Sequence, residues 1–400
     1  MRWIGLARIV RCLMAGSAAV LTAGCASTLA LDRMVLAYDQ STTDSVSKQL
    51  LLNIARARYS QPIHFTSVSS ITATYRFAVN AGIGGAITGD RGGLLVPSLG
   101  GIAEENPTVS IAPMQGDEFT QRLLTPFEEQ KLTLLLRQGY DVDSLLRLLG
   151  SELRLQDAGS RDVVAVHHNR PSDPRGYAVF RRVMAHLSSI QDRHALYVEP
   201  LFFQRTWVVP AASVTPESFQ AIYKDFSLRL SPDRRAYAVS KPTTGRIMIT
   251  NFNPGVLSND ERLELHGEAE DAPTNEILLD IRAGYPGGEY PMKGRVRLRS
   301  FHEVLTFLGR GMQEEPEFDV TPDPRTPPIK ENPVDTLKIH ESSRPPGRME
   351  TAVAFENRYF HIGDYDGYPW DKKVFGLLYQ LFQMTVAPSA QAGPAITIAK

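Results

Sequence analysis

Cysteine is almost absent from this sequence, whose 400 residues include only Cys12 and Cys25. Residues 26–400 therefore contain no thiol. This excludes an intramolecular disulfide, a thiolate zinc site and a cysteine nucleophile from that part of the chain. Beyond Cys25, no apolar run reaches the roughly 18 residues of a membrane-spanning helix.

Familiar catalytic and nucleotide-binding motifs are missing as well. The sequence has neither a G-x-S-x-G nucleophile elbow nor an H-E-x-x-H zinc pair. Gly82-Ile83-Gly84-Gly85 resembles the start of a phosphate-binding loop. Ile87, however, stands where the third glycine belongs, and no lysine follows. We therefore expect no nucleotide and no other cofactor.

An excess of basic charge is also missing. The sequence carries 43 basic and 44 acidic residues, and three of the arginines lie before residue 12. Residues 25–400 thus hold 40 basic and 44 acidic residues, a net charge of about −4. Such a chain cannot neutralise a phosphate backbone, so we expect no nucleic-acid partner. The hydrophobic share of 42% is that of a globular protein, and the length predicts about two or three compact units.

The N-terminus has the order of an export signal. Arg2, Arg8 and Arg11 precede an apolar stretch over residues 12–21 that is too short to cross a bilayer. Leu21-Thr22-Ala23-Gly24-Cys25 follows and resembles the lipobox of bacterial lipoproteins, with Thr22 where leucine is commonest. An ordinary signal peptide cut near Ala23, or an uncleaved anchor, is the alternative.

The lipobox predicts cleavage between Gly24 and Cys25 and acylation of the Cys25 thiol. Two or three acyl chains hold a protein durably on a membrane, whereas one chain binds reversibly. Ala26 stands where an aspartate would favour retention at the inner membrane. We therefore expect a lipid anchor in the outer membrane, with the folded part facing the periplasm.

A long β-hairpin is predicted next. Apolar residues alternate with mostly polar ones from Ile71 to Val79 and again around Val109 and Ile111, on either side of a glycine-rich tract over residues 81–101. Because an unpaired strand edge seeks partners, this hairpin is a candidate surface for a homo-oligomer or a protein partner. A simple flexible tip is the alternative. The candidate assembly surface consists of Ile71, Tyr75, Phe77, Val109 and Ile111.

The rest of the chain predicts an α+β protein of mixed helices and antiparallel strands. Ser300-Phe301-His302-Glu303 is a capping box, Thr125-Pro126 predicts another helix start, and one helix is expected from Asp141 to Leu153. Separate strands are expected over 236–239 and 247–250. The predicted segments are a signal peptide (1–24), a tether (25–42), a helix, hairpin and helices (43–160), a mixed body (161–312), a linker or loop (313–347) and a small α+β unit (348–400).

The predicted linker contains eight prolines in residues 313–347. Three other features have ordinary explanations. His167-His168 cannot easily share one metal, because adjacent strand residues point to opposite faces. Asp364-Tyr365-Asp366-Gly367 lacks the further ligands of a calcium loop, and Arg181-Arg182 is expected to be solvated.

Several segments together resemble a family of uncharacterised proteobacterial lipoproteins. They include residues 49–58, Ile63-His64-Phe65, Gly116-Asp117-Glu118-Phe119 and residues 377–382. The resemblance extends over most of the chain. It implies an outer-membrane envelope address and carries no activity or catalytic residue.

We therefore expect an envelope protein with a binding or structural role and without catalytic or metal-binding residues. Two alternatives stay open. An envelope hydrolase would need two carboxyl groups with separated pKa values that meet in a pocket. A lipid- or glycan-binding module would need a large cavity.

Overall fold

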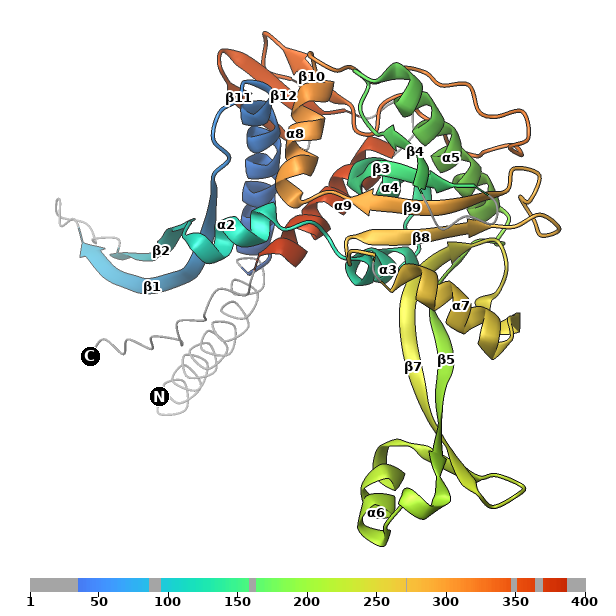
Figure 1. Cartoon of the computed structure of the whole chain (residues 1–400). Coiled ribbons are helices and arrows are strands. Elements are labelled where there is room, and N and C mark those ends of the chain that lie inside the picture. The colour runs from blue at the N-terminus through green and yellow to red at the C-terminus, as the bar shows by residue number, and fades with distance from the viewer. Residues whose placement is uncertain are drawn as a thin grey trace, which may run out of the picture. The chain divides into compact units, whose positions relative to one another are not determined.

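The computed structural model shows an α+β protein, as the sequence predicts (Figure 1). It describes residues 35–85, 95–157, 163–270, 272–346, 351–363 and 370–386.

The chain divides into two compact units. The smaller unit comprises Met1–Gln49, His64–Phe119 and Val386–Lys400, and the larger comprises Leu50–Ile63 and Thr120–Thr385.

A helix over residues 35–58 precedes the hairpin and enters both units. It includes residues 35–42, which the sequence assigned to the tether, so the helix begins earlier than the predicted position 43. The stretch contains neither glycine nor proline, and nothing in it ends a helix before Ser60, whose φ is +54°. In the smaller unit, the Gln49 side chain accepts a 2.7 Å hydrogen bond from the Thr66 amide.

The predicted hairpin is formed by β1 (Phe65–Gly85) and β2 (Leu95–Met114). Their antiparallel pairing begins at Phe65 with Met114 and continues to Gly85 with Leu95, with one irregularity between Val68 and Ser70. The pairing is longer than the predicted span of 71–111. The prediction missed the ends of the hairpin because it relied on the alternation of apolar and polar side chains. Backbone hydrogen bonds between the strands continue where this alternation stops.

The larger unit is built on one sheet with the strand order β4-β3-β9-β8-β7-β5, with β6 paired to β7. All neighbours are antiparallel except β7 and β8, which run parallel. Because β3 and β4 flank residue 160, the boundary predicted there falls within the sheet. The strands are β3 (Gly150–Gln156), β4 (Val163–His168), β5 (Tyr197–Pro210), β6 (Ser227–Leu230), β7 (Ala236–Thr250), β8 (Glu276–Ile281) and β9 (Met292–Leu298).

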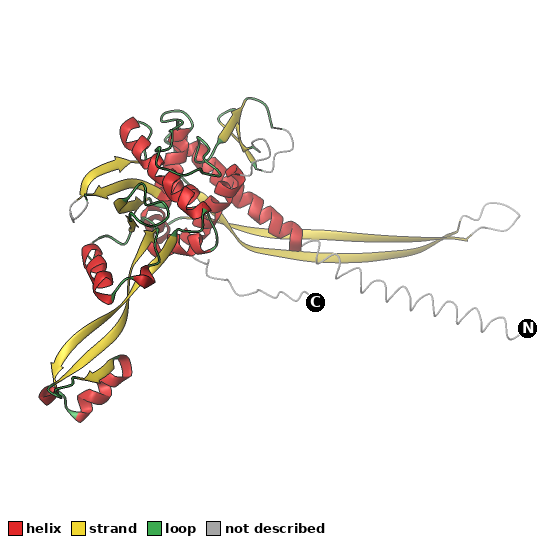
Figure 2. Ribbon diagram, turned by 90° about the vertical axis from the view of Figure 1, so that its right-hand side faces the viewer, coloured by secondary structure: helices red, strands yellow, loops and turns green. Residues whose placement is uncertain are grey.

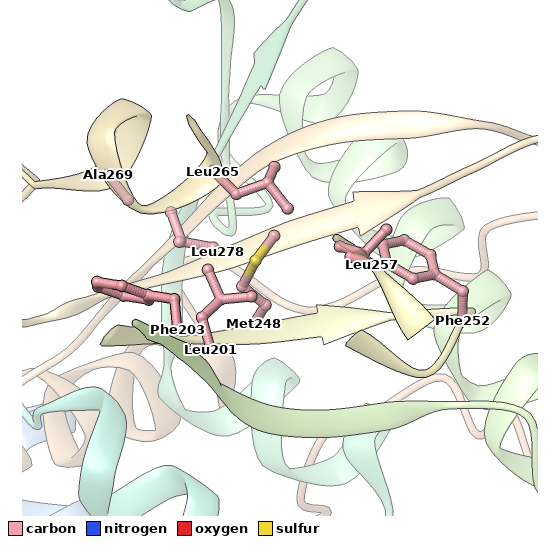
Figure 3. Packing of buried hydrophobic residues seen from close by; sticks show 8 residues of the cluster. All are labelled: Leu201, Phe203, Met248, Phe252, Leu257, Leu265, Ala269 and Leu278. Carbon is pink, nitrogen blue, oxygen red and sulfur yellow. The ribbon is translucent and has the colours of Figure 1, made fainter. Parts of the chain in front are cut away.

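One face of this sheet packs under α7 (Asn259–Ala269). Leu265 and Ala269 of the helix meet Leu201 and Met248 of the sheet, as Figure 3 shows. Burying a leucine or methionine side chain stabilises the fold by roughly 1.5–3 kcal/mol. The capping box of Ser258 and Glu261 fixes where α7 begins.

Further helices pack in the same unit. They are α4 (Val142–Leu149), α5 (Pro174–Asp192), α8 (Phe301–Gly311) and α9 (Trp370–Thr385). Every residue of α4 is buried, and α4 contacts both α5 and α9. The predicted capping box of Ser300 and Glu303 is present at the start of α8.

Beyond the body, β5 and β7 continue as a two-stranded ribbon that carries β6 and α6 (Pro216–Asp225), as Figures 1 and 2 show. Towards the C-terminus, β10 (Ile339–Ser342), β11 (Ala352–Phe355) and β12 (Arg358–Ile362) form a small sheet in the order β10-β12-β11.

The predicted helix from Asp141 to Leu153 ends early. It stops at Leu149, and Leu153 lies on β3 instead. A side chain at Gly150 would put a Cβ 2.6 Å from the Leu146 carbonyl and 2.9 Å from the Phe180 ring. A larger residue at position 150 would clash with these atoms, so the junction between α4 and β3 requires glycine.

The predicted helix start at Thr125-Pro126 was wrong. Helix α3 (Glu129–Arg137) begins later, because Pro126 forms a β-bridge with Ser300 and the Phe127 amide donates to the Arg299 carbonyl. These contacts hold the segment extended. The short helix α2 (Asp117–Leu124) precedes it.

The strands predicted over 236–239 and 247–250 form one continuous strand, β7. Pro242 lacks an amide hydrogen, and this suggested a break. In the fold, Gln204 lies opposite Pro242 and is bonded through both its amide and its carbonyl to the side chain of Asn259. Asn259 thus replaces the partner that proline cannot provide.

Candidate functional site

The predicted lipidation and cleavage residues, Gly24 and Cys25, lie outside the described residues. Of the five predicted assembly residues, the structure describes the side chains of Val109 and Ile111, which are 46% and 66% exposed. Ile71 pairs with Val109 through the backbone, Tyr75 with Glu105, and Phe77 with Ala103. The centre of the glycine tract, residues 86–94, and the aspartate turn, residues 364–367, also lie outside the described residues.

A cavity of about 730 Å³ lies in the larger unit. Strand β3, the end of β4 and the loop that follows β4 contribute Glu152, His168 and Arg170 to its wall. Arg297 of β9 and Arg310 of α8 also line it. A volume of this size is typical of small-molecule sites. The cavity is thus a candidate binding site, and the sequence alone did not reveal it.

Arg299 and Asn169 line this cavity and also close the carboxyl end of α4. The Arg299 guanidinium donates to the carbonyls of Arg147 and Leu148, at 3.2 and 3.0 Å, and its backbone amide donates to Leu149. These carbonyls have no partner inside the helix, and a cation is favourable at a helix C-terminus. Burial lowers the pKa of Arg299 to about 10, so the group stays charged at neutral pH.

Asn169 has one satisfied and one unsatisfied side-chain atom. Its Nδ2 donates to the carbonyls of Arg147 and Gly150, both at 2.8 Å. Since a carbonyl only accepts hydrogen bonds, these contacts fix which amide atom is nitrogen. Oδ1 is buried and has no hydrogen-bond partner among the described residues. This oxygen is therefore buried behind the open surface of the cavity wall.

The carboxylates of the cavity wall are all engaged in local structure. Each accepts a hydrogen bond that caps a helix, orders a strand or fixes a turn. The bonds join Glu152 to Arg154 (2.8 Å), Asp173 to the Gly176 amide (3.1 Å), Glu303 to the Ser300 amide (2.7 Å) and Glu315 to the Ser172 hydroxyl (3.0 Å).

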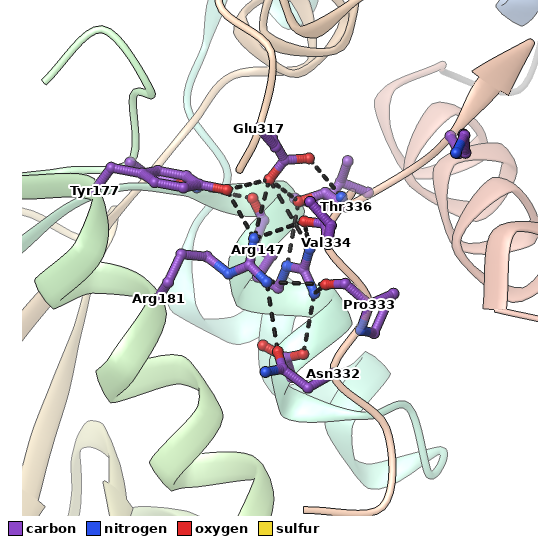
Figure 4. Close-up of polar contacts among 12 residues, drawn as sticks. Arg147, Tyr177, Arg181, Glu317, Asn332, Pro333, Val334 and Thr336 are labelled. Atoms are coloured by element: carbon purple, nitrogen blue, oxygen red, sulfur yellow. Dashed lines mark hydrogen bonds and ion pairs between the residues drawn. The ribbon is translucent and has the colours of Figure 1, made fainter. Parts of the chain in front are cut away.

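A second polar cluster lies in the same unit (Figure 4). It joins α4 and α5 to residues 313–338, a segment without helix or strand that we call the strap. The Arg147 guanidinium donates to the carbonyls of Pro333 and Val334. Arg181 donates to the same two carbonyls. The proline-rich segment is therefore packed against helices by buried cations.

Arg181 corrects the prediction that Arg181-Arg182 is solvated. Only 3% of the Arg181 surface is exposed. Its Nη1 donates to the Tyr177 hydroxyl at 2.7 Å and lies 3.5 Å from Glu317, so its charge has a buried partner. Burial by itself would lower the pKa of Arg181, but its contacts with Tyr177 and Glu317 outweigh burial and raise this pKa. The spacing of Tyr177 and Arg181 was an available sequence signal, because residues four apart share one helix face and can contact each other.

Glu317 also lines a smaller cavity of about 230 Å³, together with Asp335. Burial raises the pKa of Asp335. Glu317 accepts from the Tyr177 hydroxyl and from both the amide and the hydroxyl of Thr336. With its oxygens bonded in this way, the Glu317 carboxylate is poorly placed to attack a substrate or to remove a proton.

The described part of the chain contains neither a metal-binding cluster nor a membrane-spanning helix. No group of three or more His, Cys, Asp or Glu residues there could hold a metal ion. Within the same ranges, none of the helices combines the length and apolar character needed to cross a membrane.

The chain matches no protein-family model, and comparisons with curated proteins and with solved structures likewise gave no match.

Proposed function

We propose that this protein is a lipid-anchored component of the bacterial envelope that acts by binding, with the 730 Å³ cavity as its binding site. The observation that carries the binding role is a difference between the polar groups of the cavity wall. Its carboxylates are engaged in local structure, whereas an acceptor atom of Asn169 is buried there without a described partner.

The binding role is tested by asking whether the purified protein retains a bound small molecule. Native protein extracted in detergent should release a small molecule on denaturation, detected by mass spectrometry. Thr306 lines the cavity, so Thr306→Trp should fill the space and abolish this release. Thr206→Trp, on the exposed ribbon, is the matched control. Equal release from both variants would contradict the proposal.

The lipid anchor is supported by the sequence from Arg2 to Cys25. Acylation adds roughly 0.8 kcal/mol of membrane affinity for each buried methylene group. Cys25→Ser removes the thiol that would carry the lipid. This variant should stay unprocessed, and the parent's N-terminal peptide should show the mass of a diacylglyceryl cysteine. An unmodified N-terminal cysteine in the parent would rule the anchor out.

The hairpin is the proposed assembly surface, for self-association or for a protein partner. The exposed side chains of Val109 and Ile111 support this. The double variant Val109→Thr, Ile111→Thr keeps β-branched residues but removes apolar surface, and it should reduce assembly size in light scattering. Val163→Thr, Val166→Thr changes two exposed valines of β4 and is the control. Assemblies of unchanged size in the first variant would refute this role.

The hydrolase alternative has one observation in its favour, the raised pKa of Asp335 beside Glu317. It predicts that Asp335→Asn abolishes hydrolysis of an envelope substrate. The binding proposal predicts that this variant retains the same small molecule as the parent.

A further inference from the structure

The cavity of the proposed function contains three arginines with unused hydrogen-bond donors. The guanidinium groups of Arg170, Arg297 and Arg310 make only long ion pairs, with nitrogen–oxygen distances of 3.9, 3.7 and 4.0 Å. None of the three donates a side-chain hydrogen bond to a described residue within 3.5 Å. A guanidinium carries five N–H groups, so a large donor capacity is left over.

The carboxylates nearby do not use this capacity. Glu152 lies 3.7 Å from Arg297 but is already bonded to Arg154 at 2.8 Å. Glu315 lies 3.9 Å from Arg170 but accepts from Ser172 at 3.0 Å. The wall therefore presents guanidinium donors that its carboxylates do not use, although its four arginines and four carboxylates balance in charge.

The inner part of the cavity adds a fixed positive charge. Arg299 is 5% exposed, and its bonds go to carbonyl oxygens, with no ion pair to a carboxylate in the described ranges. Its guanidinium carbon lies 3.9 Å from the centre of the Phe307 ring. Glu317 and Glu303 act on this charge only from beyond ion-pair distance, so the buried cation still favours an anion in the adjoining space.

We propose that the cavity binds an anion whose carboxylate or phosphate groups meet Arg170, Arg297 and Arg310. An acidic sugar has this chemistry. Arginine pairs with carboxylate or phosphate through two parallel hydrogen bonds, which gives the site its preference for such groups. This inference rests on the proposed binding role and names its ligand class.

Calorimetry with defined probes tests the ligand class. Trigalacturonate, which carries carboxylates, should bind at least about tenfold more tightly than neutral maltotriose of similar size. Its affinity should fall as salt rises, because exposed charges are screened. Glucose 6-phosphate, compared with glucose, tests the phosphate version of the same chemistry.

Variants locate the binding. Arg297→Gln and Arg310→Gln should each weaken trigalacturonate about tenfold, the usual effect of a lost charge-assisted hydrogen bond. Arg229→Gln makes the same charge change on the exposed ribbon and should leave the affinity unchanged. An equal loss in Arg229→Gln would assign the effect to overall charge and overturn the proposal.

The remaining outcomes separate this inference from the binding role itself. If maltotriose binds as tightly as trigalacturonate and the arginine variants have no effect, the ligand is not an anion, and the binding role survives. If no acidic probe binds, the anion inference fails. The release assay with Thr306→Trp then decides independently whether the cavity binds anything.

Discussion

The Tyr177 hydroxyl donates a 2.8 Å hydrogen bond to Oε1 of Glu317 and so joins α5 to the strap. Tyr177 is fully buried, and burial raises the pKa of its hydroxyl, which keeps the proton needed for this bond. Glu317 faces Arg181 as well, at 3.5 Å. The strap is therefore attached by a carboxylate between a phenol and a guanidinium.

Neutralising this carboxylate should destabilise the larger unit. Glu317→Gln keeps the size of the side chain but removes the carboxylate that pairs with buried Arg181, whereas Arg147 keeps Asp143 at 3.4 Å. Breaking a buried pair in this way typically costs about 3–5 kcal/mol. Urea unfolding measures the loss. Glu314→Gln, at a side chain that is 59% exposed, should change the free energy of unfolding by less than about 0.5 kcal/mol. Similar stabilities of the two variants would show that the network does not hold the strap.

Acidification should destabilise the fold through His186. Burial is the main cause that lowers the pKa of His186 below 6.5, and the charge of Arg325 lowers it further. Carbonyl and carboxylate neighbours, Gly287, Glu289 and Asp323, act in the opposite direction. Because the native state then binds this proton less readily than the unfolded chain, the free energy of unfolding falls as pH drops from above 6.5 towards the lower native pKa.

His186→Gln isolates this contribution. Glutamine can still donate to the Gly287 carbonyl, which His186 contacts at 2.8 Å, but it does not titrate. Unfolding in urea at about pH 7.5 and about pH 5.5 should show a smaller loss in this variant than in the parent. His64→Gln, at an exposed histidine, should keep the parent's loss. An unchanged loss in His186→Gln would assign the pH effect to other groups.

Two glycines should respond to alanine with opposite signs. A Cβ at Gly245 would lie 2.8 Å from the Phe203 ring and 3.0 Å from the His266 ring, so Gly245→Ala should destabilise the protein by about 1–3 kcal/mol. Gly267 lies within α7, where no atom stands within 4 Å of the position that a Cβ would take. Gly267→Ala should stabilise by about 0.4–1 kcal/mol. Thermal unfolding of both variants measures the difference, and equal shifts would refute the packing argument.

The sequence predicted elements whose signals are local. The capping box at Ser300 appears where the pattern places it. The strand β9 was missed although Arg295 to Arg299 alternates charged and apolar residues, which is itself a strand pattern. That alternation was the available signal for Arg297 and Arg299, and hence for part of the cavity.

The sequence by itself determined the thiol-free chain after Cys25, the export signal pattern and the α+β class, because these depend on composition and on short-range periodicity. Only the tertiary structure decided that Arg147 and Arg181 are buried and that the proline-rich segment is a packed strap. The charges that hold the strap belong to residues far apart in sequence, and their low-energy pairing exists only once α4 and α5 bring them together. The same reason kept the cavity hidden, since Asn169 and Arg299 meet only at the end of α4.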